Sequence, residues 1–268
     1  MIMPTYNASR FLAGSIDSVL NQTYRNLELL IADDCSSDKA TIELLKDYMK
    51  KDPRVKVFFQ KENAGPGEAR NVCIRNAQGR YIAFCDSDDR WVADKIERQI
   101  RSMEEHDCAL CCSSYILCDQ NDEERGLYIA PEWITFDDMM RDNKIGCLTA
   151  VYDVKRLGRK FYMPTLRKRQ DWALFLSIVR ECGHAYGIAE PLAYYRMRKG
   201  SVSSHKLSLI KYNVKVYQTV LGFSTLKSYM YFFFRFIPSY TTKITKRTLD
   251  SYKYLKSKKQ GMAAVNVQ

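Results

Sequence analysis

Hydrophobic runs and polar turns alternate along the first 120 residues in the pattern of an α/β protein. Short apolar runs, of the kind buried in a parallel sheet, are each followed by a segment whose apolar side chains recur at helical spacing. The pattern predicts strands over 1–3, 27–32, 55–59, 81–85 and 109–117. It predicts helices over 11–20, 40–50, 68–76 and 95–105.

Beyond residue 121 the pattern is less regular. It predicts helices over 134–143, 171–181 and 207–221, and strands over 146–152 and 185–195. The segment 229–237, YMYFFFRFI, is apolar and aromatic but shorter than the roughly 20 residues needed to span a bilayer. It suits either an interfacial membrane segment or a segment packed onto the rest of the protein.

Carboxylates and small polar residues cluster directly after three of the predicted strands. The clusters follow Met3, Ala32 and Cys85. In an open α/β sheet, ligands bind outside the carboxyl ends of the strands. The sequence therefore predicts a ligand site at this edge of the sheet.

The sharpest of these clusters is Asp86-Ser87-Asp88-Asp89. Three carboxylates in four residues at the end of a buried strand repel one another. A divalent cation held together with a pyrophosphate removes that conflict, because Mg²⁺ and Mn²⁺ accept one or two carboxylates plus phosphate oxygens. The alternative is an Asp-rich turn, or a cap for the helix predicted to begin at Lys95.

Four motifs, in this order, resemble the signature blocks of the family 2 glycosyltransferases. They are M-P-T-Y-N (3–7), D-D-C-S-S-D (33–38), N-A-G-P-G-E-A-R-N (63–71) and G-R-Y-I-A-F-C-D-S-D-D (79–89). The resemblance implies an α/β fold of the GT-A type, a Rossmann-like nucleotide-sugar-binding domain with a mixed sheet. It implies a catalytic domain over 1–206, with a nucleotide-binding half (1–105) and an acceptor-binding half (106–206). Residues 207–268 form a helical, basic extension that the resemblance does not cover.

The resemblance also implies roles for individual residues. The nucleotide-binding residues would be Pro4, Thr5, Tyr6, Asp33, Asp34, Arg70, Asp86 and Ser87. Thr5 and Tyr6 would line a uracil pocket, and Asp34 would accept a hydrogen bond from the base. Arg70 would lie near the diphosphate and Asp86 near the ribose. Asp88 would bind the cofactor, a divalent Mn²⁺ or Mg²⁺ that bridges the phosphates and neutralises the departing diphosphate.

A base is still needed to take the proton from the acceptor hydroxyl. Family members carry an acidic residue in an E-D-W-like motif, and this chain reads Lys168-Arg169-Gln170-Asp171-Trp172. Asp171 is therefore the catalytic candidate, acting by direct displacement with inversion at the anomeric carbon. Its alternative role is an N-cap for the following helix.

The stretch 195–203 (YRMRKGSVS) resembles a family block in which a loop closes over the donor phosphates. Arg196 and Arg198 are the candidates for phosphate contacts. Arg198 stands where members often carry a histidine, so no histidine metal ligand is assigned.

Charge is distributed unevenly over the 268 residues, whose formal net charge is +11. From Arg196 to the end, fifteen Lys and Arg face a single acid, Asp250, so the preceding residues are mildly acidic. The basic end predicts an anionic partner, and its interleaved aromatic and aliphatic runs favour a membrane surface over nucleic acid. A solvated helical appendage is the alternative.

Nine cysteines lie at no disulfide-like spacing, and the first residues lack the charged and apolar regions of a secretory signal. Reduced thiols and a cytoplasmic location, peripheral at the inner face of the cell membrane, are therefore expected.

Taken together, the sequence predicts an inverting glycosyltransferase of the hexosyltransferase type. It would move a sugar from a UDP-sugar to a lipid-linked or polysaccharide acceptor in cell-surface glycan synthesis. The alternatives are a nucleotidyltransferase-like enzyme, which would share the sheet and the carboxylates, and a nucleic-acid-binding module acting through the basic tail. A P-loop is excluded because no G-x-x-x-x-G-K-[ST] occurs.

Overall fold

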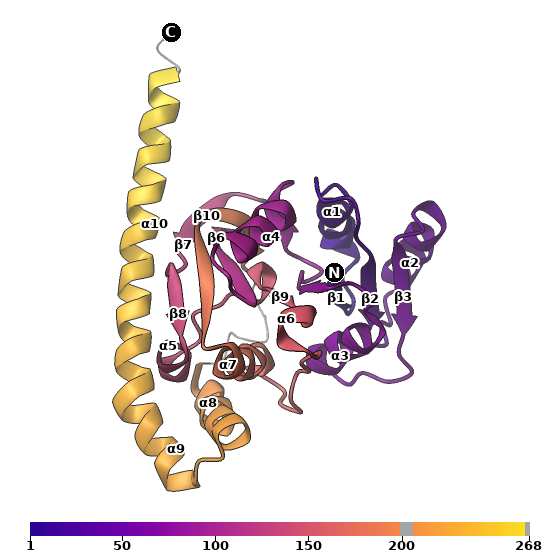
Figure 1. The fold of residues 1–268 in the computed structure, drawn as a ribbon. Coiled ribbons are helices and arrows are strands. Elements are labelled where there is room, and N and C mark those ends of the chain that lie inside the picture. The colour runs from indigo at the N-terminus through magenta and orange to yellow at the C-terminus, as the bar shows by residue number, and fades with distance from the viewer. Residues whose placement is uncertain (199–205, 266–268) are drawn as a thin grey trace.

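A computed structural model describes residues 1–198 and 206–265, and its centre is a mixed β-sheet covered by helices (Figure 1). The first half supplies three parallel strands in the order β1-β2-β3, with a helix after each one. These elements are β1 (Ile2–Thr5), α1 (Ser9–Leu20), β2 (Leu29–Asp33), α2 (Lys39–Lys51), β3 (Val55–Phe59) and α3 (Pro66–Asn76).

A second set of strands follows in the order β4-β9-β6-β10-β5, with β7 beside β6 and β8 beside β10. Strands β6 and β10 are parallel, and the other pairs in this set are antiparallel. The strands are β4 (Tyr81–Ala83), β5 (Arg90–Trp91), β6 (Leu110–Cys118), β7 (Glu124–Tyr128), β8 (Trp133–Thr135), β9 (Val151–Asp153) and β10 (His184–Arg196). A bridge between Ile2 and Phe84 joins the two sets, and the Cys85 amide donates to Ile2 O at 3.0 Å.

Alternate residues of the central strands face two separate cores. Ile2 and Leu30 pack into a core with α3 and α7, whereas Met3 and Ile31 pack into a core with α1 and α4. The helices of this part are α4 (Lys95–Glu105), α5 (Phe136–Arg141), the 3₁₀ turn η1 (Cys147–Thr149), α6 (Val154–Leu157) and α7 (Gln170–Cys182). Burial on both faces explains why these strands read as continuous apolar runs in the sequence.

The C-terminal part is helical and folds back onto the sheet domain. It comprises α8 (Lys206–Leu221), α9 (Thr225–Tyr231), the π-helical turn η2 (Phe232–Phe236) and α10 (Ile237–Val265). Pro238 has no amide hydrogen to continue the α-helical ladder, and the π-helical turn ends two residues before it. At a rise of about 1.5 Å per residue, α10 is about 44 Å long, and Figure 1 shows it running along one side of the molecule and past its body.

The C-terminal helices share a core with the sheet domain. Phe232 and Phe236 of η2 are buried, and Phe236 lies 5.5 Å from Trp172 of α7 between ring centroids. Tyr217 of α8 meets the same tryptophan edge to face at 5.5 Å. The aromatic segment predicted from 229–237 therefore packs partly inward. Within the described ranges, the structure contains no helix whose length and apolarity together would let it cross a lipid bilayer.

Two parts of the predicted secondary structure were wrong or incomplete. The strand expected over 146–152 is split, because Cys147–Thr149 form a 3₁₀ turn and only Val151–Asp153 pair as β9. The short strands β5, β7 and β8 were not predicted, since each is too short or too polar to show a period of two.

Candidate active site

The loops after β1, β2 and β4 lie at one edge of the sheet, as the sequence predicted. Asn7, which follows β1 with a φ of 46°, joins the first two loops. Its side-chain oxygen accepts hydrogen bonds from the amides of Ser37 and Asp38, each at 3.0 Å. Its own amide donates to Ser36 Oγ at 2.9 Å. Asparagine suits this position because it tolerates a left-handed backbone better than most residues. The two loops are therefore held together without a ligand.

Asp33 and Asp34 are both buried and both bonded within the protein. Asp33 accepts from the amide and hydroxyl of Ser36, at 3.0 and 2.5 Å. Asp34 accepts from the amides of Ala64 and Gly65, each at 2.8 Å, so it fixes the glycine-containing turn before α3. The hydrogen bond predicted between Asp34 and a base stays a prediction, and it would use the acceptor capacity that these bonds leave.

The end of β1 offers groups that the described part of the protein does not satisfy. Thr5 is buried, and its hydroxyl oxygen has no hydrogen-bond partner among the described residues. Pro4 is buried beside it in β1, whereas half of the surface of Tyr6 is exposed (50%). A buried hydroxyl without a partner is costly unless a ligand or water completes it. The end of β1 is therefore suited to contact a polar ligand.

Arg70 and Asp86 form the central ion pair of the site, with a guanidinium–carboxylate distance of 2.5 Å. Arg70 comes from α3, and its side chain is only 8% exposed. Burial by itself would lower the pKa of Arg70, but the charges of Asp86 and, more weakly, Asp171 raise it above the ordinary value. Arg70 is thus a permanent cation placed between the end of β4 and the start of α7.

Asp88 and Asp89 lie in an environment that disfavours their negative charges. Burial, followed by the charge of Asp86, raises the pKa of Asp88, and Arg198 partly opposes the shift. Burial and the charges of Asp88 and Asp86 raise the pKa of Asp89 well above its ordinary value. One oxygen of Asp89 has no hydrogen-bond partner within the described chain. Ser87 is buried between these residues.

These carboxylates fit a divalent cation. No group of three or more His, Cys, Asp or Glu side chains in the described part of the chain could hold a metal by itself. Mg²⁺ and Mn²⁺ are instead commonly held by one or two carboxylates together with substrate phosphates. Asp88 and its neighbour Asp86 supply such a donor set, and the raised pKa of Asp88 shows the charge conflict that a cation would relieve.

Arg198 and Arg196 have different positions in this site. Arg198 Nε lies 2.6 Å from Asp88 Oδ2, and its side chain is 40% exposed, so it stands where it could meet phosphate. Arg196 is buried and already bonded: it donates to the carbonyl oxygens of Asp88 and Asp119, at 3.0 and 3.1 Å, and pairs with Asp122. Its phosphate contact, predicted from the sequence, has this competing structural role. The rest of that predicted loop, 199–203, lies outside the described residues.

Asp171 is the second residue of α7, and its carboxylate does not cap the helix. The N-cap position is taken by Arg169, which has a left-handed backbone (φ 67°). Asp171 Oδ2 instead accepts a hydrogen bond from Asn143 Nδ2 at 3.1 Å. The neighbouring Gln170 packs against Gly67, where an added Cβ would come within 3.0 Å of its side chain. These contacts bring the start of α7 against the start of α3.

The half-buried thiol of Cys147 is influenced by charges from both halves of the site. Burial is the main cause of its raised pKa, the charges of Asp86, Asp171 and Asp89 raise it further, and Arg70 opposes them. One thiol therefore lies within electrostatic range of the carboxylates after β4 and of Asp171 on α7.

Several residues of this site were not found from the sequence. Asn143, which orients Asp171, falls at the end of a predicted helix and carries no motif. Asn7 and Asp89 lie inside recognised motifs, but only their contacts show that they join loops and anchor the Arg196 amide, respectively.

Comparison with known proteins identifies the family and the fold. The family model described as glycosyl transferase family 2 matches residues 1–163. The chain belongs to the family 2 glycosyltransferases. It is therefore a glycosyltransferase, and the nucleotidyltransferase alternative is set aside.

Two similar proteins are bacterial glycosyltransferases. TuaG of Bacillus subtilis, assigned to teichuronic acid biosynthesis as a glycosyltransferase, is 41% identical over 221 residues, which cover 82% of this chain and 87% of TuaG. WfgD of Escherichia coli is 37% identical over 212 residues, covering 79% of this chain and 81% of WfgD. Its name describes a UDP-Glc:α-D-GlcNAc-diphosphoundecaprenol β-1,3-glucosyltransferase.

Solved structures agree on the fold. TarS of S. aureus, crystallised with UDP, superposes with a TM-score of 0.63 at 19% identity, over 85% of this chain and 67% of the TarS chain. The mannosyltransferase PcManGT of Pyrobaculum calidifontis, in complex with GDP-Man and Mn²⁺, gives a TM-score of 0.58 at 14% identity, over 100% of this chain and 79% of its own. The GT-A fold with a mixed sheet, predicted from the sequence motifs, is confirmed.

Proposed function

We propose that this glycosyltransferase moves a hexose from a UDP-sugar to a sugar carried on a membrane lipid, with inversion at the anomeric carbon. The names of two relatives support the substrate classes. WfgD and WfaP of Escherichia coli, 37% and 34% identical to this chain, are both described as using UDP-Glc and a diphosphoundecaprenol-linked acceptor. The cluster of carboxylates and arginines around Arg70 supports the proposed transfer reaction.

One observation carries the proposal. The carboxylates after β4 and the carboxylate of α7 both lie against the start of α3. Arg70 of α3 pairs with Asp86 at 2.5 Å, and Gly67 of the same helix packs against Gln170, the residue before Asp171. A donor held by the first set would therefore present its anomeric carbon near Asp171. Proximity of this kind is the main requirement for direct displacement.

On the donor side, Thr5, Tyr6 and Asp34 would surround the base. Thr5 has a buried hydroxyl without a partner in the described chain, and Tyr6 has an exposed ring. Pro4, Asp33 and Ser87 would shape the same pocket from the strand ends, where all three are buried. Asp86 would accept hydrogen bonds from the ribose.

On the phosphate side, Arg70 and Arg198 would stabilise the diphosphate, with Arg196 bracing the loop beneath it. A divalent Mn²⁺ or Mg²⁺ held by Asp88, when bound, would supply positive charge to the leaving diphosphate. Arg198 now pairs with Asp88 and is the more exposed partner. It is therefore free to turn toward phosphate when a cation takes over that carboxylate.

Asp171 would act as the general base. Its carboxylate would accept the proton of the acceptor hydroxyl while the hydroxyl oxygen bonds to the anomeric carbon. The bond from that carbon to the donor's phosphate oxygen breaks with its electron pair, and UDP leaves. Asn143 holds one oxygen of Asp171 at 3.1 Å, so the other oxygen is left to face the acceptor.

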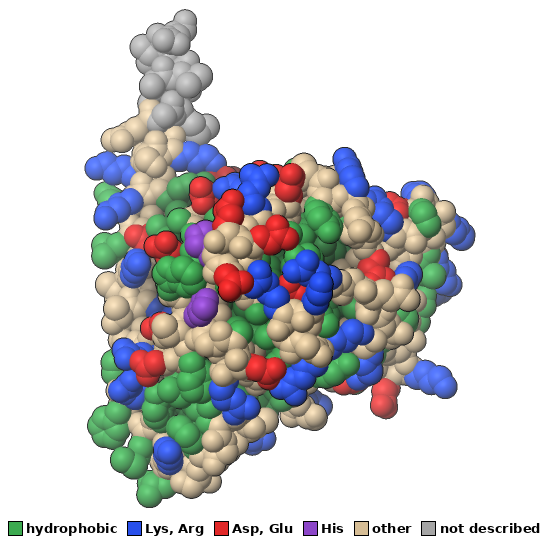
Figure 2. Space-filling model, in the orientation of Figure 1, with side chains coloured by type: hydrophobic (Ala, Val, Ile, Leu, Met, Phe, Trp, Pro, Cys, Tyr) green, Lys and Arg blue, Asp and Glu red, His purple; other side chains and the backbone are tan. Residues whose placement is uncertain are grey.

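The C-terminal helices would hold the enzyme at the inner face of the cell membrane. Figure 2 shows apolar side chains gathered over α9 and the start of α10, with Lys and Arg around them. We call this surface the apolar tip; its exposed members are Leu226, Tyr229, Met230, Phe233, Phe234 and Ile237. An apolar surface among basic residues is typical of proteins that bind anionic membranes.

Calorimetry with UDP, GDP and dTDP, with and without Mn²⁺, tests the donor site. We expect metal-dependent binding of UDP to the wild type and at least tenfold weaker binding to Asp88→Ala. Asp47→Ala, which removes an exposed carboxylate of α2, is the matched control and should bind like the wild type. If no nucleotide binds under any metal condition, the proposed donor is wrong.

A co-sedimentation assay at several salt concentrations tests the partner of the basic end. Binding to anionic vesicles and not to DNA or RNA is expected. Binding to nucleic acid alone would contradict the membrane proposal.

A further inference from the structure

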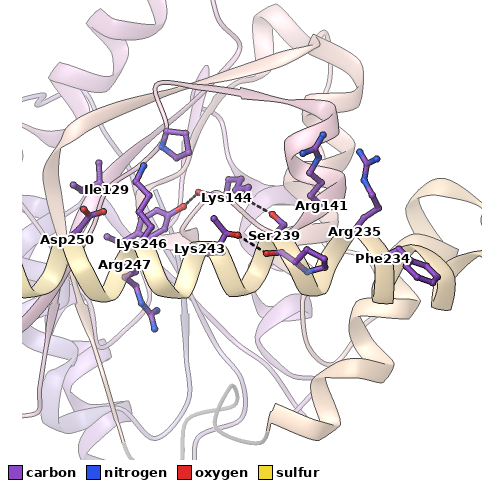
Figure 3. A pocket seen from close by; sticks show the side chains of 14 residues that line it. Ile129, Arg141, Lys144, Phe234, Arg235, Ser239, Lys243, Lys246, Arg247 and Asp250 are labelled. Atoms are coloured by element: carbon purple, nitrogen blue, oxygen red, sulfur yellow. Dashed lines mark hydrogen bonds between the residues drawn. The ribbon is translucent and has the colours of Figure 1, made fainter.

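A cavity of about 540 Å³ lies between α10 and the sheet domain (Figure 3), and no residue of the loops after β1, β2 and β4 lines it. Its walls come from the segment after β7, from α5 with the loop that follows, and from η2 and the first half of α10. A volume of roughly 300–1,000 Å³ is usual for small-molecule sites. The cavity is therefore large enough for a ligand head group.

The cavity is strongly basic. Six cations line it, namely Arg141, Lys144, Arg235, Lys243, Lys246 and Arg247, against one lining carboxylate, Asp250. Asp137 pairs with Arg141 and Arg235, and Asp142 pairs with Lys144 and Lys243. Lys246 and Arg247 form no ion pair with any described residue, so the surplus is positive. Figure 3 shows Lys246 rising from α10 on the same side as Arg141 and Arg235. Such an arrangement favours a small, highly charged anion.

A single residue, Asn143, connects the wall of the cavity to the candidate base, Asp171. Lys243 Nζ donates a hydrogen bond to the carbonyl oxygen of Asn143, and Lys144 follows Asn143 in the chain. The side chain of Asn143 holds Asp171. An acceptor whose sugar hydroxyl lies at Asp171 would therefore have the group on its reducing end close to these lysines.

The rim of the cavity is apolar on the side of the apolar tip, the surface proposed to face the membrane. Phe234 lines the cavity with 74% of its surface exposed; Phe233 of the apolar tip precedes it, and Ile237 of the tip lies three residues farther along the chain. A cationic hollow beside exposed aromatic rings matches a molecule with a charged head and a long hydrocarbon chain.

We propose that this cavity binds the diphosphate of a polyprenyl-linked acceptor, with the hydrocarbon chain leaving over Phe234 into the membrane. The proposal rests on the proposed function insofar as the acceptor is lipid-linked. It assigns a binding site for the acceptor's anionic head, separate from the donor's diphosphate at Arg70 and Arg198. The occupant is the acceptor's diphosphate and not the head group of a bulk phospholipid, because the cations converge in a hollow whose wall residue Lys144 adjoins Asn143, the hydrogen-bond partner of Asp171.

The binding of farnesyl diphosphate to the full chain, measured by calorimetry with UDP and Mn²⁺ at saturation, tests this assignment. The cavity variant Arg235→Gln/Lys246→Gln should bind the probe at least tenfold more weakly than the wild type. The control Lys253→Gln/Lys256→Gln removes the same charge from exposed positions farther along α10, and its affinity should change less than twofold. Equal affinities for the two double variants would overturn the proposal.

Two further measurements separate the alternative sources of phosphate. Asp88→Ala should bind farnesyl diphosphate like the wild type; loss of binding would place the probe in the donor site and overturn the proposal. Both double variants should bind phosphatidylglycerol vesicles to the same extent. If the cavity variant loses vesicle binding but keeps the probe, the cavity contacts bulk lipid and the assignment is wrong.

The test of UDP as the donor nucleotide is independent of the measurements with farnesyl diphosphate. A wild type that binds farnesyl diphosphate but no UDP would refute the proposed donor and leave the cavity assignment standing. A wild type that binds UDP but not the probe would refute the cavity assignment alone.

Discussion

A neighbouring side chain donates a hydrogen bond to only one of the two carboxylate oxygens of Asp171. Asn143 donates to Oδ2 at 3.1 Å, and the helix start behind it is fixed by Gln170 packing on Gly67. A base must be oriented as well as near its proton. The left-handed backbone at Arg169 is the local strain that accompanies this placement.

Replacing Asp171 with asparagine keeps the size of the side chain and removes the proton acceptor. We expect kcat to fall by about 10²- to 10⁴-fold, the usual contribution of general base catalysis, while the affinity for UDP changes less than twofold. Steady-state kinetics and calorimetry measure the two quantities. Glu181→Gln, near the other end of α7, is the control and should keep its activity; a similar loss there would mean that the helix and not the base is affected.

The pKa of Lys95 is lowered by burial. No Asp or Glu side chain is among the groups that set this pKa. Burial lowers its pKa to about 7, against an ordinary value of 10.5. Its ammonium donates to Gln99 Oε1 at 2.5 Å and lies 4.1 Å from the centroid of the Trp91 ring. These contacts do not replace the hydration that the charge has lost.

The pH dependence of stability follows from this shift. Between pH 7 and 10 the unfolded chain holds a proton on Lys95 that the folded chain has released, so this residue makes the protein more stable as the pH rises. The free-energy difference between Lys95→Met and the wild type should therefore favour methionine most at pH 7 and shrink toward pH 10. Chemical denaturation at four pH values measures it; a difference that stays constant with pH would show that Lys95 keeps its proton in the native state and that its pKa is not lowered.

Local sequence patterns identified candidate residues that lie close to their own strand end, and missed contacts with partners that are distant in the sequence. Asp86 and Asp88 are recognisable because three carboxylates follow an apolar run. Arg196 has a basic side chain in a recognised block, but it bonds to Asp88 O across more than a hundred residues of sequence. No local pattern contains that information, so its competing structural role emerged only from the fold.

At the scale of elements, α10 is fastened to α5 by a buried carboxylate. Asp142 is 1% exposed and lies 2.6 Å from Lys144 Nζ and 2.9 Å from Lys243 Nζ. Ser239 Oγ of α10 donates to the same carboxylate at 2.5 Å. Burial would raise the pKa of Asp142, but the two lysines together lower it below its ordinary value.

Asp142→Asn should leave two partly buried ammonium groups without a counter-charge. We expect a loss of about 3 kcal/mol in the free energy of unfolding, the low end for breaking a buried pair, because both lysines keep some contact with water. The lowered pKa means that the stabilisation is complete above about pH 4 and disappears as the pH falls through the folded value. Urea unfolding at pH 7 and pH 3 checks both points; a variant equally destabilised at the two pH values would contradict this account.

Element boundaries were predictable where the hydrophobic pattern and the end signals coincide. The strand Val55–Phe59 and the helix Lys95–Glu105 begin and end where the sequence placed them. The 3₁₀ turn at Cys147–Thr149 was mistaken for a strand because Cys147 and Leu148 are apolar and lie just before the apolar start of β9. Strands β7 and β8 are defined by pairing with β6 and β10, which a local pattern cannot reveal.

On the scale of the whole molecule, one side of the C-terminal helices is buried in the core and the other side is exposed. One side, through Phe232 and Phe236, completes the core around Trp172. The other side exposes the apolar tip and lines the basic cavity. The division into a catalytic domain (1–206) and an extension (207–268) stays a prediction, and the shared core indicates that the two parts fold together. This coupling would set the distance between the membrane and Asp171.

The apolar tip should therefore determine membrane affinity without affecting the fold. Leu226 and Phe234 are 73% and 74% exposed, so changing both to serine removes no core contact. Full transfer of a leucine or phenylalanine side chain from water is worth about 1.5–3 kcal/mol, and partial insertion of two such residues predicts a roughly tenfold to hundredfold weaker partition into phosphatidylglycerol vesicles. Leu249→Ser/Tyr252→Ser removes two exposed apolar groups of α10 outside the tip, 55% and 65% exposed, and should bind nearly as the wild type does. Vesicle sedimentation at 0.1 and 0.5 M salt measures both variants beside the wild type. A tip variant that binds vesicles like the wild type would show that the basic residues alone hold the enzyme at the membrane, and that the exposed aromatic side chains have another partner.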